Sequence, residues 1–186
     1  MSNTLITETE QQLLKSMVGG QFESYQCDPF VYSPMVFGIV GLAVSGKIYR
    51  LRADLKHVRR FFTDEEVACF QLEEASGSDI VSRMENGALV ETPIRAVIRS
   101  ISIVNDIQTV CRGDQRKRFA STTGILFHLE DHQEVSFELE TWFSEMITVK
   151  RGYDLMKTFA PETEFLEEWE AFGEYEAQCR REVIVF

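Results

Sequence analysis

An apolar stripe at helical spacing crosses residues 4–18 and predicts an amphipathic helix there. Thr7 is followed three residues later by Glu10, a pair typical of a capping box at a helix start. Two glycines at 19–20 then end the helix. The apolar stripe consists of Leu13, Leu14, Met17 and Val18.

Helical spacing returns only after residue 150. The stretch "GYDLMKTFA" predicts a short helix that ends before Pro161, and a second helix is expected to start near that proline. The segment 162–176 holds seven glutamates and no basic residue, so one face of this second helix is strongly acidic. The final residues, "EVIVF", predict a returning edge strand.

Between these helices the polar and apolar positions alternate with a period of two, which is typical of strands. Ser45-Gly46 and Asn86-Gly87 predict the tight turns of two hairpins; the arm before Ser45 is apolar on both faces, and the arm after Gly46 alternates. A third hairpin is predicted over 124–140, because the apolar parity is the same on both sides of its polar turn. Residues 96–111 predict one long strand, with a bend at Asn105-Asp106.

The segment 55–75 is ambiguous, because a possible capping box at Thr63 and Glu66 competes with alternation from Val67 onward. We favour a turn at 63–65 followed by a strand over a helix, although a short apolar run does not separate the two by period alone.

These elements predict an α+β fold, mainly antiparallel sheet, closed in part as a barrel or folded as a sandwich. The chain contains no alternating strand–helix–strand pattern of the kind that builds a parallel sheet. We expect a single domain over 1–186, with an N-terminal helix at 1–19, an antiparallel β core at 20–150 and a helical C-terminal part at 151–186.

Composition narrows the classes of partner. Thirty acidic against 19 basic residues give a formal net charge of −11, which disfavours nucleic acid and an anionic membrane surface as partners.

The N-terminus is polar and lacks the features of a signal peptide, and the longest apolar run, 35–44, is too short to cross a bilayer. The expected location is therefore the cytoplasm. The four cysteines have no metal-binding spacing, and we expect neither a metal nor another cofactor.

No sequence motif of a catalytic or phosphate-binding site is present, so an enzymatic role is uncertain and a non-enzymatic one is favoured. His128 and His132 lie among carboxylates and could contribute to a metal site. A solvated acidic hairpin tip explains the same residues better, because one histidine belongs to a strand and the other to the turn.

Two basic clusters stand out in this acidic chain and together hold eight of its 19 basic residues. Arginine dominates both clusters and suits bidentate recognition of carboxylate or phosphate, so both are candidate ligand- or partner-binding sites. The competing interpretation of the first cluster is a solvated hairpin tip. The first cluster is Arg112, Arg116, Lys117 and Arg118; the second is Arg52, Lys56, Arg59 and Arg60.

The leading functional hypothesis is a cytoplasmic, non-enzymatic interaction domain that binds an unknown protein or forms a homodimer. The acidic helix and the basic clusters are opposite in sign and could meet across a two-fold axis. Alternatively, residues 112–118 could pair with 162–176 within one monomer. A second hypothesis is a β-barrel that binds a small anionic ligand, such as a nucleotide or flavin phosphate. A hydrolase or transferase is the weakest hypothesis, because no nucleophile with its base is apparent.

Overall fold

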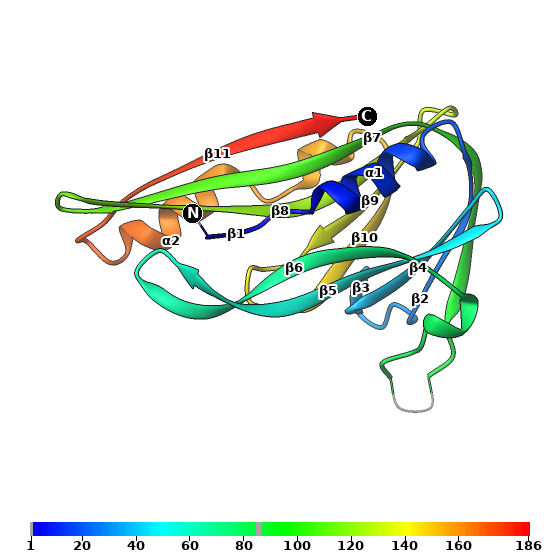
Figure 1. Ribbon diagram of the computed structural model, residues 1–186, viewed down its shortest axis with the longest axis horizontal. Helices are drawn as coiled ribbons and strands as arrows, with labels where there is room; N and C mark the ends of the chain where they lie inside the picture. Colours follow the sequence, from blue (N-terminus) through cyan, green and yellow to red (C-terminus); the bar gives the residue numbers. More distant parts are fainter. Residues whose placement is uncertain (1, 85–86) are drawn as a thin grey trace.

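The computed structural model describes residues 2–84 and 87–186 and consists largely of strands (Figure 1). None of the described helices combines the length and the apolar composition needed to cross a membrane. The elements are β1 (Ser2–Thr4), α1 (Glu8–Met17), β2 (Gln21–Cys27), β3 (Met35–Phe37), β4 (Ile39–Val44), β5 (Lys47–Arg60), β6 (Thr63–Ala75), the 3-10 helix η1 (Gly77–Asp79), β7 (Val90–Arg112), β8 (Gln115–Leu129), β9 (Glu134–Leu139), β10 (Met146–Gly152), the 3-10 helix η2 (Leu155–Thr158), α2 (Glu162–Glu170) and β11 (Glu176–Val185).

The strands form one sheet, and the predicted mainly antiparallel character is confirmed. Hydrogen-bonded neighbours follow the order β3-β10-β9-β8-β7-β2-β4-β5-β6, while β11 pairs with β7 and β1 pairs with β8. Among the strand pairs of the described residues, only β1–β8 is parallel. The path of paired strands is open among the described residues, so the sheet does not close into a barrel.

The long strand β7 joins the two layers seen in Figure 1. Its first residues, 90–97, pair with β2, and the rest pairs with β8 on one edge and β11 on the other. The register shifts where β7 meets Phe22 and Ser24, and Arg95 has a φ of +58° in this stretch. An irregularity of this kind bends a strand, which lets β7 pass from one layer to the other.

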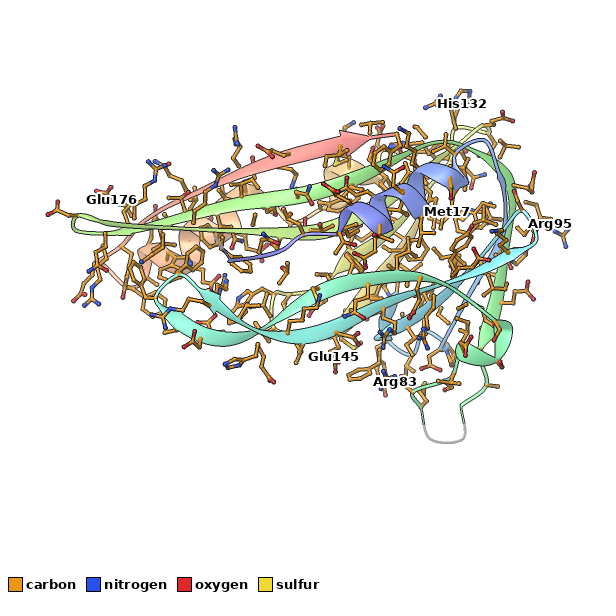
Figure 2. All side chains as sticks on the ribbon, viewed as in Figure 1. Met17, Arg83, Arg95, His132, Glu145 and Glu176 are labelled. Atoms are coloured by element: carbon orange, nitrogen blue, oxygen red, sulfur yellow. The ribbon has the colours of Figure 1, made fainter. Side chains whose placement is uncertain are left out.

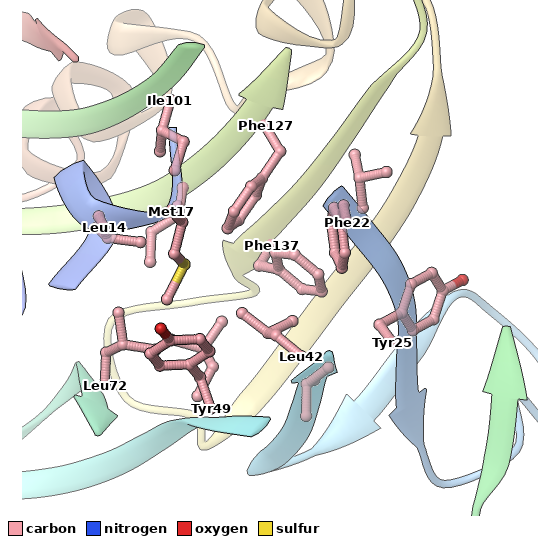
Figure 3. Close-up of a cluster of buried hydrophobic side chains, with 14 of the residues drawn as sticks. Leu14, Met17, Phe22, Tyr25, Leu42, Tyr49, Leu72, Ile101, Phe127 and Phe137 are labelled. Carbon is pink, nitrogen blue, oxygen red and sulfur yellow. The ribbon is translucent and has the colours of Figure 1, made fainter. Parts of the chain in front are cut away.

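The main core lies between these layers and is closed by α1 (Figure 3). The predicted capping box starts this helix: Thr7 accepts from the N–H of Glu10, whose side chain accepts from the N–H of Thr7. Leu14 and Met17 of α1 are fully buried against aromatic side chains of the sheet. These include Phe22, Tyr49, Phe127 and Phe137.

A second apolar cluster lies where α2 packs against β11 and the β5–β6 turn. Phe61, in this turn, lies 5.9 Å from Phe165 and 5.3 Å from Trp169 between ring centroids. Side chains fill the space between the layers along the molecule, and Glu176 and Arg95 lie near its opposite ends (Figure 2).

Three sequence predictions of turns and strands are confirmed. Ser45 and Gly46 have φ of +51° and +75° and connect β4 with β5 in a two-residue turn. The hairpin over 124–140 forms as β8 and β9. Residues 63–75 are a strand, but the turn lies earlier than predicted, at 61–62.

Other boundaries differ from the predictions. Residues 80–84 and 87–89 are not in strands, so the expected strand arms of the Asn86-Gly87 hairpin do not form, while Asn86 itself lies outside the described residues. The C-terminal part is also less helical than expected. The first predicted helix there is only a 3-10 turn, η2, and the returning strand β11 begins at Glu176 because it pairs with β7 over ten residues.

Candidate functional site

A cavity of about 360 Å³ lies beside the second apolar cluster. Its wall comes from segments far apart in the chain: the end of β5, β6, β7, β8, the end of β9 with the following connection, the residues around α2, and β11. No local sequence pattern could have revealed it, because the site exists only once these segments meet. A second, smaller cavity of about 220 Å³ lies between β2, β4, β5 and η1.

Two contacts hold the wall in place. The backbone carbonyl of Trp142, in the connection after β9, accepts a 2.7 Å hydrogen bond from the N–H of Ala68 at the open edge of β6. Phe159 lies directly over Gly124 of β8, where a Cβ atom would meet the Phe159 ring at 2.2 Å. Glycine is therefore needed at position 124 for the Phe159 ring to pack this closely against β8.

Arg60, at the end of β5, is the most deeply buried cation of the cavity wall, and only 3% of its side chain is exposed. Its guanidinium carbon lies 4.0 Å from the centroid of the Trp142 ring and 5.1 Å from that of Phe61, so it stacks between aromatic groups. Nη1 donates to Oε2 of Glu65 over 3.5 Å, which is a long hydrogen bond.

The other edge of this guanidinium, Nε and Nη2, is buried without a hydrogen-bond partner among the described residues. Buried donors without partners are rare, because each loses its bonds to water without replacement. Burial lowers the pKa of Arg60 below its ordinary value, and the charges of Glu168 and Glu65 act in the opposite direction. Thr141 also contributes a buried, unpartnered oxygen to the wall.

The residue after Arg60 is held in an unfavourable backbone conformation. Phe61 has a φ of +52°, a region that bulky side chains avoid. Its ring is fixed by Phe119, Phe165 and Trp169. Strain of this kind persists only where surrounding packing supports it, and such positions cluster at binding sites.

Arg181 of β11 lies in the same cavity wall and provides a direct comparison. Its Nε and Nη2 donate to Oδ1 and Oδ2 of Asp106, each over 2.8 Å. This is the bidentate geometry in which a carboxylate takes two parallel donors. The equivalent edge of Arg60 has no such carboxylate.

Carboxylates also line the cavity. Glu138 is paired with Lys150 over 2.8 Å, and Glu162 accepts from the backbone N–H of Arg181. Three further glutamates of the wall are exposed and have no side-chain hydrogen bond to any described residue. They are Glu140, Glu164 and Glu168.

The predicted basic cluster 112–118 lies at the tip of the β7–β8 hairpin. Arg112 is exposed and pairs with Glu174 over 3.2 Å, with its guanidinium carbon 5.6 Å from the Tyr175 ring. The sequence left open whether residues 112–118 pair with 162–176 within one monomer, and the Arg112–Glu174 ion pair is a contact of this kind. The other three residues of this cluster are exposed near the start of β8, next to the hairpin turn. They are Arg116, Lys117 and Arg118.

The predicted cluster on β5 is divided by the fold, and most of its charges are already paired. Arg52 lies 3.4 Å from Asp54, and Arg59 lies 3.2 Å from Asp64. Lys56 is exposed, whereas Arg60 alone enters the cavity wall. The two clusters lie on strands of different layers (Figure 1).

A chain of hydrogen bonds missed by the sequence analysis joins Ser102, His128 and Glu134. Ser102 Oγ lies 2.8 Å from Nε2 of His128, whose Nδ1 lies 2.9 Å from Oε1 of Glu134. The order resembles a serine nucleophile with its base and orienting carboxylate. However, Ser102 is only 3% exposed and lines neither cavity. Oε2 of Glu134 accepts from the N–H of Leu155, so the chain attaches η2 to the sheet.

The two histidines suggested for a metal site have different surroundings. His132 lies in the β8–β9 turn with a φ of +66°, whereas the ring of His128 makes hydrogen bonds with Ser102 and Glu134. Over residues 2–84 and 87–186 no group of three or more His, Cys, Asp or Glu side chains is placed to hold a metal ion.

Comparison of the chain with models of known protein families, with curated proteins and with solved structures found no match. The function must therefore be argued from the site itself.

Proposed function

We propose that this protein is a non-enzymatic binding domain whose ligand is a small organic carboxylate held in the cavity beside Arg60. The observation that carries the proposal is the unpartnered Nε/Nη2 edge of a buried arginine in the cavity wall. Asp106 shows on Arg181 how a carboxylate fills such an edge. A ligand carboxylate on Arg60 would supply two charge-assisted hydrogen bonds, which are among the stronger interactions a site can offer.

The remaining wall supports an apolar body for this ligand. Trp142, Phe159 and Phe165 line the cavity, together with aliphatic side chains. A volume of about 360 Å³ falls in the range of small-molecule sites, which are mostly apolar with a few fixed polar groups. The cavity is therefore suited to a molecule with one charged end and one large hydrophobic group.

Long-range charge opposes an anion here, since the whole chain has a formal net charge of −11. Screening limits this repulsion to roughly 8 Å at physiological ionic strength, whereas a bidentate contact with the buried Arg60 guanidinium acts at hydrogen-bond distance. A carboxylate carries a single charge and meets less repulsion from the wall glutamates than a phosphate dianion. The small anionic ligand of the second sequence hypothesis is thus retained in the proposal, with carboxylate preferred over phosphate and without the barrel that this hypothesis assumed.

Entry to the site requires a small rearrangement. The two unpartnered nitrogens of Arg60 are shielded from solvent, so a ligand reaches them only when a neighbouring side chain turns aside.

The test is a pair of ligands that differ only in charge: 3-phenylpropionate and its neutral amide, 3-phenylpropionamide. Isothermal titration calorimetry should detect binding of the carboxylate and at least tenfold weaker binding of the amide, because only the carboxylate accepts two hydrogen bonds from Arg60. At a ligand concentration 100 times Kd, native-state binding should add about 2.7 kcal/mol to the free energy of unfolding.

The matched variants are Arg60→Lys and Arg59→Lys. Lysine keeps the charge at 60 but removes the planar pair of donors, so the preference for the carboxylate should be lost. Arg59 is the exposed neighbour outside the cavity, and its variant should bind like the wild type. Equal binding of acid and amide, or binding unaffected by Arg60→Lys, would contradict the proposal.

A further inference from the structure

We infer that the ligand is an α-amino acid with a large apolar side chain, its carboxylate on Arg60 and its ammonium group on Glu168. This inference rests on the proposed function and adds a second charge to the ligand. Both residues line the same cavity, Arg60 at the end of β5 and Glu168 on α2.

The cavity wall combines a buried donor edge with exposed acceptors. Arg60 offers buried donors that lack an acceptor, and Glu140, Glu164 and Glu168 offer exposed carboxylates that make no hydrogen bond to a described side chain. A simple carboxylate would satisfy the arginine but bring a further negative charge beside these glutamates. A simple amine would pair with a glutamate but leave the buried guanidinium edge empty. A ligand with both charges satisfies the arginine and adds no net negative charge to the acidic wall.

Glu168 is the carboxylate best placed for the ammonium group. It lies on α2 between Phe165 and Trp169, whose rings lie 5.9 and 5.3 Å from the ring of Phe61, the residue after Arg60. In agreement with this placement, its charge raises the pKa of the Arg60 guanidinium against the effect of burial. An α-amino acid carries its two charges on one carbon atom, so it needs a cation and an anion that lie close together. The aromatic side chains of Trp142, Phe159 and Phe165 then face the remaining apolar group.

The test compares three probes of one shape: L-phenylalanine, 3-phenylpropionate without the ammonium group, and phenethylamine without the carboxylate. Calorimetry should give L-phenylalanine a Kd at least about tenfold lower than that of 3-phenylpropionate, as expected for one added charge-assisted hydrogen bond. Phenethylamine should bind more weakly than both, because it leaves Arg60 without an acceptor.

Variants of two adjacent glutamates on α2 locate the ammonium group. In Glu168→Gln the preference for L-phenylalanine over 3-phenylpropionate should fall to about threefold or less, whereas Glu167→Gln, outside the cavity, should keep it. The readout is a ratio within each variant, so a general change in stability does not affect it.

Each contrary result has a separate meaning. If 3-phenylpropionate binds as tightly as L-phenylalanine, the amino-acid inference fails and the proposed carboxylate site stands. If phenethylamine binds most tightly, the cavity is a site for organic cations and both proposals fail. Both also fail if none of the three probes binds at millimolar concentration.

Discussion

The residue that carries this interpretation is Arg60, whose burial has little benefit for the fold. Its Glu65 contact is long, and two of its nitrogens have no partner. Replacing a buried ion pair by apolar residues of similar volume is often neutral or stabilising, and Glu65, whose side chain is 29% exposed, keeps its contact with water when Arg60 is removed. We therefore expect Arg60→Met to keep the wild-type free energy of unfolding within about 1 kcal/mol, or to raise it, while carboxylate binding is lost.

Urea unfolding followed by circular dichroism measures this difference. A purely structural Arg60 would instead make the variant less stable by about 3–5 kcal/mol, the usual cost of breaking a required buried ion pair. Arg52→Met is the control, since Arg52 is half-buried on the same strand and pairs with Asp54 outside the cavity.

Cys179, which also lines the cavity, should be an unreactive thiol. Burial, followed by the charges of Asp106 and Glu162, raises its pKa to about 12. A raised pKa lowers the thiolate fraction at neutral pH, and the thiolate is the reactive form. At pH 8 we expect alkylation by iodoacetamide to be about 100-fold or more slower than that of free cysteine, with the rate rising steadily with pH toward 12.

Peptide mass spectrometry follows this reaction, with free N-acetylcysteine in the same tube as the reference thiol. Modification of Cys179 at the rate of the reference would show that its surroundings are more open than the cavity wall described above.

At the scale of elements, Gly124 determines how closely the segment before α2 approaches β8. A Cβ atom there would meet the Phe159 ring at 2.2 Å, while the backbone of this residue needs no left-handed conformation. Gly124→Ala should therefore lower the free energy of unfolding by about 1–3 kcal/mol through overpacking alone.

A double variant isolates that cause. Phe159→Leu in the Gly124→Ala background should recover part of the loss, which chemical denaturation reads as a favourable coupling between the two sites. Gly77→Ala has open space around its Cβ and should change stability by less than about 0.5 kcal/mol. If the double variant is as unstable as the sum of both single ones, Phe159 does not rest on Gly124.

The sequence predicted best those elements whose signals are local. The Ser45-Gly46 turn requires positive φ at both residues, and the capping box of Thr7 and Glu10 lies within one helical turn. The residues before Asn86 show where local signals fail. They precede Asn86-Gly87, a strong turn signal in the sequence, yet 80–84 form no strand, since pairing in a sheet depends on a partner that sequence pattern does not reveal.

The candidate site was predictable only in part. Arginine-rich clusters directed attention to Arg60, but its charge alone suggested an exposed residue. Arg60 is buried because Trp142, more than 80 positions later in the chain, packs on its guanidinium group. The helix α2, from yet another part of the chain, lines the same cavity. The Ser102–His128–Glu134 chain was missed for the same reason, because strand register across β7, β8 and β9 brings its members together.

At the scale of the whole molecule, the fold has two apolar clusters with different roles. The larger one, closed by α1, contains the most deeply buried side chains and accounts for most of the apolar burial. The smaller one, around α2 and the β5–β6 turn, borders the cavity and includes Phe61 in its strained conformation. This division places the cavity, with its few charged groups, outside the main core.

The most direct test of the carboxylate site is the NMR signal of the Arg60 Nε–H group during titration with 3-phenylpropionate, assigned by its disappearance in Arg60→Lys. A hydrogen bond to the ligand carboxylate should move this signal downfield and saturate with the calorimetric Kd. The Nε–H signal of Arg181, already bonded to Asp106 at 2.8 Å, should stay in place. An Arg60 signal that does not move while the ligand binds would show that the carboxylate is held elsewhere and would contradict the proposed site.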